Sequence, residues 1–120
     1  MQELNMRNYA HLGDAVWELF VREQMVDMCK NPKDLHKETT ARVKASFQSY
    51  LLEKIETELT EEEQEIERRA RNMEVPVARR NNQKEYRRAT AFEALVGYWY
   101  REDKERLNKF FEKMLSEIIK

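Results

Sequence analysis

The sequence predicts an all-α protein that folds as a single domain over residues 1–120, and three observations favour this fold class. Two glycines and two prolines are few for 120 residues, whereas sandwiches, barrels and dinucleotide-binding folds need many glycine turns. Hydrophobic residues recur at helical spacing in five segments, and no segment alternates as a strand would. Aromatic residues make up 10% of the chain, which argues against disorder although 38% of the residues are charged. We therefore expect about five main helices around one core.

The first predicted helix covers residues 7–28, because an apolar stripe recurs there at helical spacing. Its members are Leu12, Ala15, Val16, Leu19, Phe20 and Val26. Asn31 and Pro32 then supply an N-cap and a proline suited to a first helical turn. We expect the second helix to run from there to about residue 58.

The third predicted helix opens at Thr60, whose hydroxyl can accept a hydrogen bond from a backbone N–H one turn later while Glu63 reaches back, as in a capping box. This helix should end near Asn72. Residues 73–82 contain Pro76 and are predicted to form a basic loop.

The fourth predicted helix, residues 83–101, is apolar over much of its circumference, which is typical of a central and largely buried helix. After Glu102 and Asp103, a fifth helix with an apolar stripe from Leu107 to Ile118 is predicted to continue to the C-terminus.

The residue types present exclude several classes of protein. A lone cysteine, Cys29, cannot form an internal disulfide or a cysteine-based zinc site, and we expect a free thiol in a reducing cytosol. The two histidines, His11 and His36, are too few for a histidine-based metal site. No apolar run reaches the ~18 residues of a membrane span. The N-terminus lacks the basic head and apolar stretch of a signal peptide, so we expect a cytoplasmic protein without a membrane partner.

The net charge of -1 conceals two neighbouring segments of opposite charge. Residues 53–67 hold eight acidic residues and one lysine, and residues 68–88 hold eight basic and two acidic residues. A surface that binds a polyanion would produce such a separation. A solvated acidic helix followed by a basic loop would produce it equally well.

Two acidic residues stand among apolar neighbours on different predicted helices. Asp14 follows a helix-interior glycine, Gly13, in HLGDAVWEL, and Glu93 lies in TAFEALVGYWY. A carboxylate at such a position is costly unless an arginine or a metal ion neutralises it, and both interpretations are open for each residue taken alone. Together the two residues suggest a carboxylate pair that holds Mg²⁺, with the basic segment 68–88 nearby to bind a phosphodiester. This pattern is typical of a nuclease.

At these residues the sequence resembles the ribonuclease III family. HLGDAVWEL (11–19) is similar to the signature helix of that family, and FEALVGYWY (92–100) is similar to its second acidic motif. DLHK (34–37), RARN (69–72) and EYRRATAFEALVGY (85–98) resemble the compact Mini-ribonuclease III branch more closely. That branch lacks a double-stranded RNA-binding domain, so we expect none after residue 120.

The resemblance implies a Mg²⁺-dependent endoribonuclease, with Mn²⁺ able to substitute, that cuts both strands of structured or double-stranded RNA to 5′-phosphate and 3′-hydroxyl ends. It implies precursor 23S ribosomal RNA as the natural substrate and gives no reason to expect DNA. Asp14 and Glu93 take the positions of the family's catalytic, metal-binding acids. Full-length relatives carry further acids where this chain has Ala10 and Thr90, so we expect a single tightly held Mg²⁺ in each protomer.

The resemblance also implies a homodimer formed through the signature helices. The small Ala10 and Gly13 would allow close packing there, and Trp17 would lie either in that contact or in the core. RNA would be bound through its phosphates and 2′-hydroxyls. The candidate RNA contacts are His36, Lys37, Arg71, Asn72, Arg79, Arg80, Asn81, Asn82, Lys84, Arg87 and Arg88. Any of these arginines can instead pair with the acids of residues 53–67, and His36 can be an ordinary helix-surface residue.

Two other classes of function stay open. A non-catalytic relative would keep the fold as an RNA-binding or ribosome-assembly module, although retention of both Asp14 and Glu93 argues against it. A helical protein-interaction domain without an RNA role would bind duplex RNA either not at all or without dependence on salt.

Overall fold

The computed structural model describes residues 5–119; residues 1–4 and Lys120, which the predicted domain and last helix include, lie outside the described residues. Within that range the chain forms six α-helices, two 3₁₀-helices and no strand, which confirms the all-α prediction. The elements are α1 (Met6–Met28), α2 (Pro32–Val43), α3 (Ala45–Ile55), η1 (Glu56–Glu58), α4 (Glu61–Arg71), η2 (Val77–Asn82), α5 (Gln83–Glu102) and α6 (Lys104–Ile118). None of these helices is long and apolar enough to cross a membrane.

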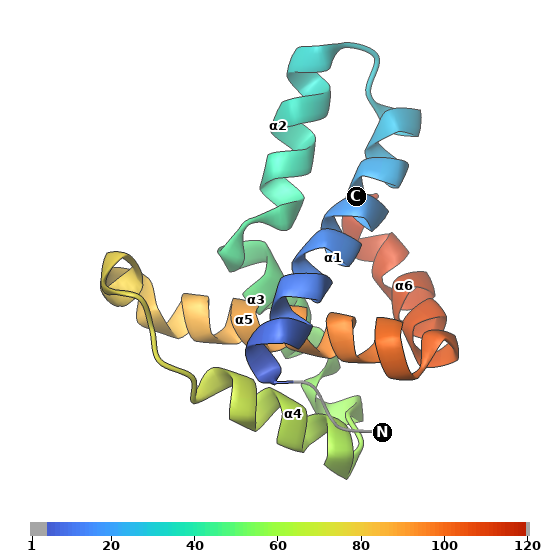
Figure 1. The fold of residues 1–120 in the computed structure, drawn as a ribbon. Coiled ribbons are helices and arrows are strands. Elements are labelled where there is room, and N and C mark those ends of the chain that lie inside the picture. Colours follow the sequence, from blue (N-terminus) through green and yellow to red (C-terminus); the bar gives the residue numbers. More distant parts are fainter. Residues whose placement is uncertain (1–4, 120) are drawn as a thin grey trace.

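Helix α5 lies at the centre of the fold, as its apolar circumference predicts. It contacts α1, α3, α4 and α6, and in Figure 1 it crosses α1 while α4 lies below it. Its buried side chains include Phe92, Leu95 and Trp99. Burying side chains of this size contributes about 2 kcal/mol each, so α5 accounts for much of the packing that joins the other helices.

An aromatic cluster joins α1, α5 and α6 in the core. Trp17 of α1 packs edge-on against Phe92 of α5, with ring centroids 5.0 Å apart. Phe20 of α1 stacks on Phe111 of α6 with ring centroids 3.9 Å apart. Because Trp17 is 0% exposed, it is a core residue, as one of its two sequence interpretations proposed.

The predicted second helix is in fact two helices, so the expectation of one element as far as residue 58 is wrong. Lys44 is extended, with φ -73° and ψ 158°, and it separates α2 from α3. Tertiary hydrogen bonds hold the break: Trp17 Nε1 donates to the carbonyl of Arg42 at 2.9 Å, and Arg42 Nε donates to the carbonyl of Ile118 at 2.7 Å. No proline or glycine marks the position, so local sequence carries no signal for it.

The face of α1 that enters the core differs from the predicted stripe. The buried residues of α1 are Met6, Tyr9, Ala10, Gly13, Trp17, Phe20, Val21 and Met25. Of the predicted stripe only Phe20 is buried, while Leu19 and Val26 are 61% and 59% exposed and Ala15 is exposed as well. The helix carries two apolar stripes, and periodicity alone does not determine which one the fold buries.

The segment between α4 and α5 is more ordered than predicted. The expectation of a loop over residues 73–82 is correct only for residues 73–76, because Val77–Asn82 forms the 3₁₀-helix η2. The backbone N–H of Arg79 donates to the carbonyl of Pro76 at 2.9 Å, which closes the first turn of η2. Residues 76–82 are exposed and basic, as the composition predicts, whereas Val75 is buried.

Candidate active site

Helices α1 and α5 cross in backbone contact at two glycines. A methyl group on Gly13 would lie 1.7 Å from the carbonyl oxygen of Glu93, and one on Gly97 would lie 1.9 Å from the carbonyl oxygen of Tyr9. No side chain fits at either position, which explains a glycine inside each helix despite a cost of about 1 kcal/mol relative to alanine. The crossing brings Asp14, the residue after Gly13, to the side of Glu93, one turn before Gly97.

The carboxyl group of Glu93 is perturbed by its surroundings, which include Asp14. Asp14 is exposed and Glu93 is half-buried. Burial raises the pKa of Glu93 to about 8, together with the negative charge of Asp14 and a hydrogen bond between the two side chains. The amide of Gln48 acts in the opposite direction and is outweighed. Glu93 therefore keeps its proton at neutral pH unless a cation joins the pair.

The two carboxylates open into a cleft of about 400 Å³ between α1, α5 and the loop after α4. Residues at helical spacing line the cleft from both helices: Arg7, His11 and Asp14 from α1, and Tyr86, Thr90 and Glu93 from α5. Arg87 lies at the same cleft. Guanidinium groups bind phosphate oxygens well, so a cleft with this lining suits a phosphate beside the carboxylate pair.

The carboxylate pair fits a hard divalent cation. Mg²⁺ keeps several waters and takes one or two protein carboxylates together with phosphate oxygens, and the cleft leaves room for both. Thr90 adds no carboxylate to the pair, and its hydroxyl donates to the carbonyl of Tyr86 at 2.9 Å. Within residues 5–119 no group of three or more His, Cys, Asp or Glu side chains is placed to hold a metal ion. The described residues thus place two carboxylates, those of Asp14 and Glu93, together at the cleft.

Several residues at the site were not predicted from the sequence. Gln48 of α3 is 2% exposed, and its Nε2 donates to Oε2 of Glu93 at 3.3 Å. Arg7 and His11 precede Asp14 by seven and three residues and therefore share its face of α1, a signal that the sequence did contain. No such signal existed for Gln48, because its place depends on the break at Lys44.

Five of the predicted RNA contacts lie together. Arg71, Asn72, Lys84, Arg87 and Arg88 line one groove of about 600 Å³. This basic groove shares Arg87 with the cleft that holds the carboxylates, so the two form a continuous surface.

The other predicted contacts lie outside the basic groove. Arg79, Arg80, Asn81 and Asn82 are exposed on η2. His36 and Lys37 are exposed on α2, and His36 lines a separate pocket with Arg22 and Val26. The structure therefore does not bring the two α2 residues together with the basic groove.

Some of the groove arginines also contact the protein itself. Arg88 forms an ion pair with Glu56, and Arg71 lies 3.4 Å from Glu67. These contacts confirm that arginines of the basic segment pair with acids of residues 53–67. Arg87 Nη1 donates to two backbone carbonyls at the end of α4 and just after it. These guanidinium groups are thus held in place at the groove rather than moving freely.

The three residues predicted for a dimer contact are covered by the chain itself. Ala10 and Trp17 are 8% and 0% exposed, and Gly13 lies against the backbone of α5. Their small size or apolar character serves the packing of α1 within one protomer, so the structure gives these three residues a place in the interior rather than on a free surface.

Comparisons with known proteins agree with this geometry. The chain matches the family model of the Ribonuclease III domain over residues 7–104. It is 43% identical over 107 residues to Mini-ribonuclease 3 of Gloeobacter violaceus, covering 89% of this chain and 79% of that protein. It is 37% identical over 125 residues to Mini-ribonuclease 3 of Clostridium tetani, covering 100% of this chain and 77% of that protein. A crystal structure of a Fusobacterium nucleatum protein is similar with a TM-score of 0.84 and 32% identity, over 97% of this chain and 95% of that one.

The chain therefore belongs to the ribonuclease III family, and its class is that of an endoribonuclease. Within the family it is a member of the Mini-ribonuclease III branch. The family assignment that the motifs around Asp14 and Glu93 predicted is confirmed.

Proposed function

We propose that this endoribonuclease hydrolyses both strands of double-stranded or structured RNA with Mg²⁺, or with Mn²⁺ in its place, and leaves 5′-phosphate and 3′-hydroxyl ends. The observation that carries the proposal is the pair of Asp14 and Glu93 in the cleft, where the pKa of Glu93 rises to about 8. Glu63, by contrast, is neutralised by a fixed cation of the protein, Arg106. The pair at the cleft instead suits a cation from solution.

We assign different roles in the reaction to the residues that line the cleft. Asp14 and Glu93 would hold the cation, and Glu93 would release the proton that it carries at neutral pH. When bound, a divalent cation lowers the pKa of a water and stabilises the charge on the leaving oxygen. Arg7 and Arg87 line the same cleft and supply donors for phosphate oxygens. No side-chain nucleophile is needed, because water is the attacking group.

The basic groove supports an RNA duplex as the substrate. A-form RNA hides its base edges in a deep major groove, so proteins bind it through phosphates and 2′-hydroxyls. Lys84 and the held arginines of the basic groove suit such contacts, and binding should weaken steeply with salt. We propose precursor 23S ribosomal RNA as the natural substrate in the cytoplasm, on the resemblance to the Mini-ribonuclease III branch, and we expect neither DNA nor a membrane as a partner.

We further propose that the enzyme is a homodimer in which each protomer cuts one RNA strand. Leu19 of α1 and Tyr100 of α5 are 61% and 40% exposed and line a groove of about 220 Å³. Val16, Phe20, Leu107 and Phe111 also line this groove. The polar residues Glu23, Lys104 and Asn108 border the exposed Leu19 and Tyr100 at this groove. Exposed apolar side chains with a polar border suit a protein–protein contact, so we assign the second copy to this face of α1.

The decisive experiment measures cleavage of a long RNA duplex and of an RNA hairpin, with Mg²⁺ or with chelator. It compares the wild type with Asp14→Asn, which removes a charge and keeps the shape of the side chain. We expect metal-dependent cuts by the wild type and none by the variant, with folding and dimerisation intact in both.

The other outcomes would contradict the proposal in different ways. Tight duplex binding without any cutting by the wild type would favour the non-catalytic RNA-binding relative. Absent or salt-insensitive duplex binding would favour a helical domain for protein contacts.

A further inference from the structure

We infer that Gln48 is a positioning residue for Glu93: its amide holds one carboxylate oxygen of Glu93 so that the other stays available to the cation beside Asp14. The inference rests on the proposed function, since it assigns a role within the same site. None of the motifs quoted in the sequence analysis includes Gln48.

The burial of Gln48 supports this role. Its side chain is 2% exposed and lies on the face of α3 that also buries Leu51, Leu52 and Ile55. An apolar side chain would be the ordinary choice there, because burying an amide costs free energy unless it finds a hydrogen-bond partner. Its donor finds one in Oε2 of Glu93, 3.3 Å away.

The position of Gln48 depends on the break between α2 and α3 and on the packing of α3 against α5. Lys44 breaks the chain between α2 and α3, and Trp17 and Arg42 hold that break through backbone carbonyls. Helix α3 then packs along α5, and Gln48 is in its first turn, with its backbone N–H donating to the carbonyl of Lys44 at 3.1 Å. Three helices thus contribute to the site: α1 with Asp14, α5 with Glu93 and α3 with Gln48.

The chemistry of an amide explains why glutamine suits this position. A lysine or arginine would neutralise Glu93 and compete with the cation. The N–H of an amide is neutral, so it fixes the orientation of the carboxylate and leaves its charge for the metal. Hydrogen bonds of this kind to metal-binding side chains are worth about 10- to 100-fold in metal affinity or activity.

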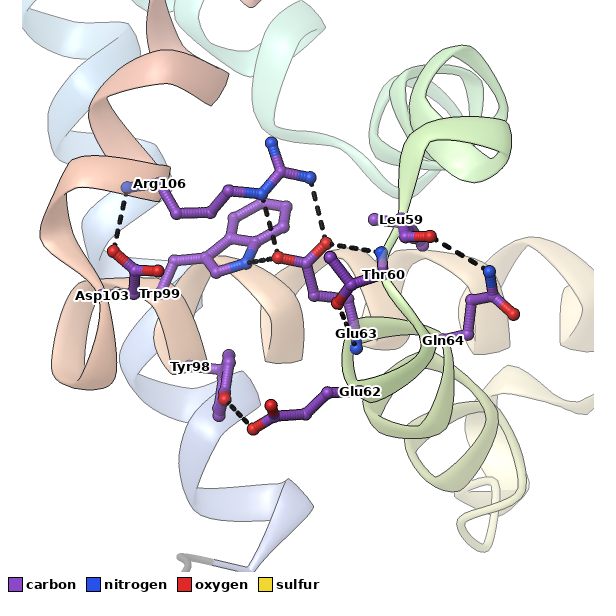
Figure 2. A network of polar contacts seen from close by, with 9 residues as sticks. All are labelled: Leu59, Thr60, Glu62, Glu63, Gln64, Tyr98, Trp99, Asp103 and Arg106. Carbon is purple, nitrogen blue, oxygen red and sulfur yellow. Dashed lines mark hydrogen bonds and ion pairs between the residues drawn. The ribbon is translucent and has the colours of Figure 1, made fainter.

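The test compares Gln48→Met with Gln64→Met. Methionine keeps the length of glutamine and removes the donor. Gln64 is the control, because its side chain also donates a hydrogen bond, to the carbonyl of Leu59 at 3.0 Å near the start of α4 (Figure 2). Gln64 does not line the cleft. Mn²⁺ affinity is measured by the electron paramagnetic resonance signal of free Mn²⁺, and kcat and KM are measured on an RNA duplex.

For Gln48→Met we expect Mn²⁺ binding weaker by about 10- to 100-fold, a lower kcat and an unchanged KM for RNA. Gln64→Met should leave all three quantities as in the wild type. In metal-free crystals of Gln48→Met, the carboxylate of Glu93 should leave its wild-type orientation. Gln48→Asn, which keeps the amide but is too short to reach Glu93, gives a second variant with the same expected losses if the first does not fold.

Wild-type Mn²⁺ affinity in the Gln48 variants, or equal losses in Gln48→Met and Gln64→Met, would overturn the inference. A failure of the proposed function looks different, because then the wild type itself would neither bind Mn²⁺ nor cut RNA. The two failures are therefore distinguishable.

Discussion

Glu63 of α4 and Glu93 of α5 are both carboxylates at the packing of α5, and the protein surrounds them differently. Figure 2 shows Glu63 within a complete set of donors. Arg106 donates to it through Nε at 2.9 Å and Nη2 at 3.0 Å, and Trp99 Nε1 donates at 2.8 Å. Burial acts to raise the pKa of Glu63, but hydrogen bonds from Arg106, the N–H of Thr60 and Trp99 outweigh it, and the pKa falls below its ordinary value.

Glu93 has the opposite surroundings. Its neighbours are a second carboxylate, Asp14, and the neutral amide of Gln48, so its pKa rises. The comparison teaches that burial alone does not mark a functional acid. Folding neutralises the charge of Glu63 with fixed groups of the chain and leaves the charge of Glu93 to be neutralised from solution. A substitution at Glu63 should therefore change mainly the stability of the protein, and a substitution at Glu93 mainly its activity.

The largest effects are expected when Glu93 and Glu63 are each replaced by glutamine and both variants are tested for activity and for stability. Glu93→Gln should reduce cleavage on the order of a thousandfold. It should leave metal-free stability unchanged or higher, because the amide is neutral, like the protonated carboxyl group that it replaces. Glu63→Gln should lower the free energy of unfolding by about 2 kcal/mol and leave kcat unchanged, because it weakens charged hydrogen bonds far from the cleft. Urea unfolding and cleavage assays on both variants measure this. Loss of activity in both variants would mean that the two regions do not act separately.

Substitution of a glycine where α1 and α5 cross should have the next largest effect on stability and activity. A methyl group on Gly97 would overlap the carbonyl oxygen of Tyr9, so Gly97→Ala should push α1 away from α5. We expect the free energy of unfolding to fall by about 3 kcal/mol and kcat to fall with it, because Asp14 moves away from Glu93.

Ala89→Gly, at a buried position of the same helix outside the crossing, is the control for the crossing glycines. It should lose about 1 kcal/mol of stability without a change in kcat. An unchanged kcat in folded Gly97→Ala would show that the crossing does not position the acids.

The pH dependence of metal-free stability should have opposite signs at the two carboxylates. The pKa of Glu93 rises from 4.5 to about 8 on folding, so between these values the folded chain binds a proton that the unfolded chain has lost. Stability from this group is full below the unfolded pKa and falls as pH rises, by up to about 1.4 kcal/mol per pH unit. The lowered pKa of Glu63 acts in reverse: its contribution is present above 4.5 and is lost as the pH falls through the folded pKa.

Urea unfolding with chelator, as a function of pH, tests these signs. The stability of the wild type relative to Glu93→Gln should fall between about pH 5 and pH 8. The stability of the wild type relative to Glu63→Gln should fall only in more acidic solution. A flat difference between the wild type and Glu93→Gln across the neutral range would refute the assignment of the raised pKa.

The smallest effect is expected from a comparison of exposed arginines with an arginine that is held by an ion pair. Arg79 and Arg80 are exposed on η2, whereas Arg88 is held by Glu56. Replacing Arg79 and Arg80 together by alanine should weaken duplex binding and lower the slope of log affinity against log salt by about 1 to 2, with no loss of stability. Arg88→Ala should reduce both binding and stability. Unchanged duplex affinity in the double variant would remove η2 from the RNA surface.

Most helices of this protein could be predicted from local sequence because the signals that define them act within a few residues. The capping box of Thr60 and Glu63 forms as expected, with hydrogen bonds of 3.1 and 3.0 Å. Asn31 caps α2 by accepting from the N–H of Asp34 at 2.9 Å, followed by Pro32 in the first turn. The motifs around Asp14 and Glu93 likewise predicted the family, through their resemblance to its two acidic motifs.

The sequence by itself thus determined the fold class, the starts of the five predicted helices and the two acids of the candidate site. Only the tertiary structure decided the break at Lys44, the face of α1 that enters the core and the presence of Gln48 beside Glu93. These features depend on hydrogen bonds and packing between segments far apart in the chain, such as Trp17 with the carbonyl of Arg42. Periodicity and capping describe one helix at a time, so they carry no information about which residues another helix will bring to it.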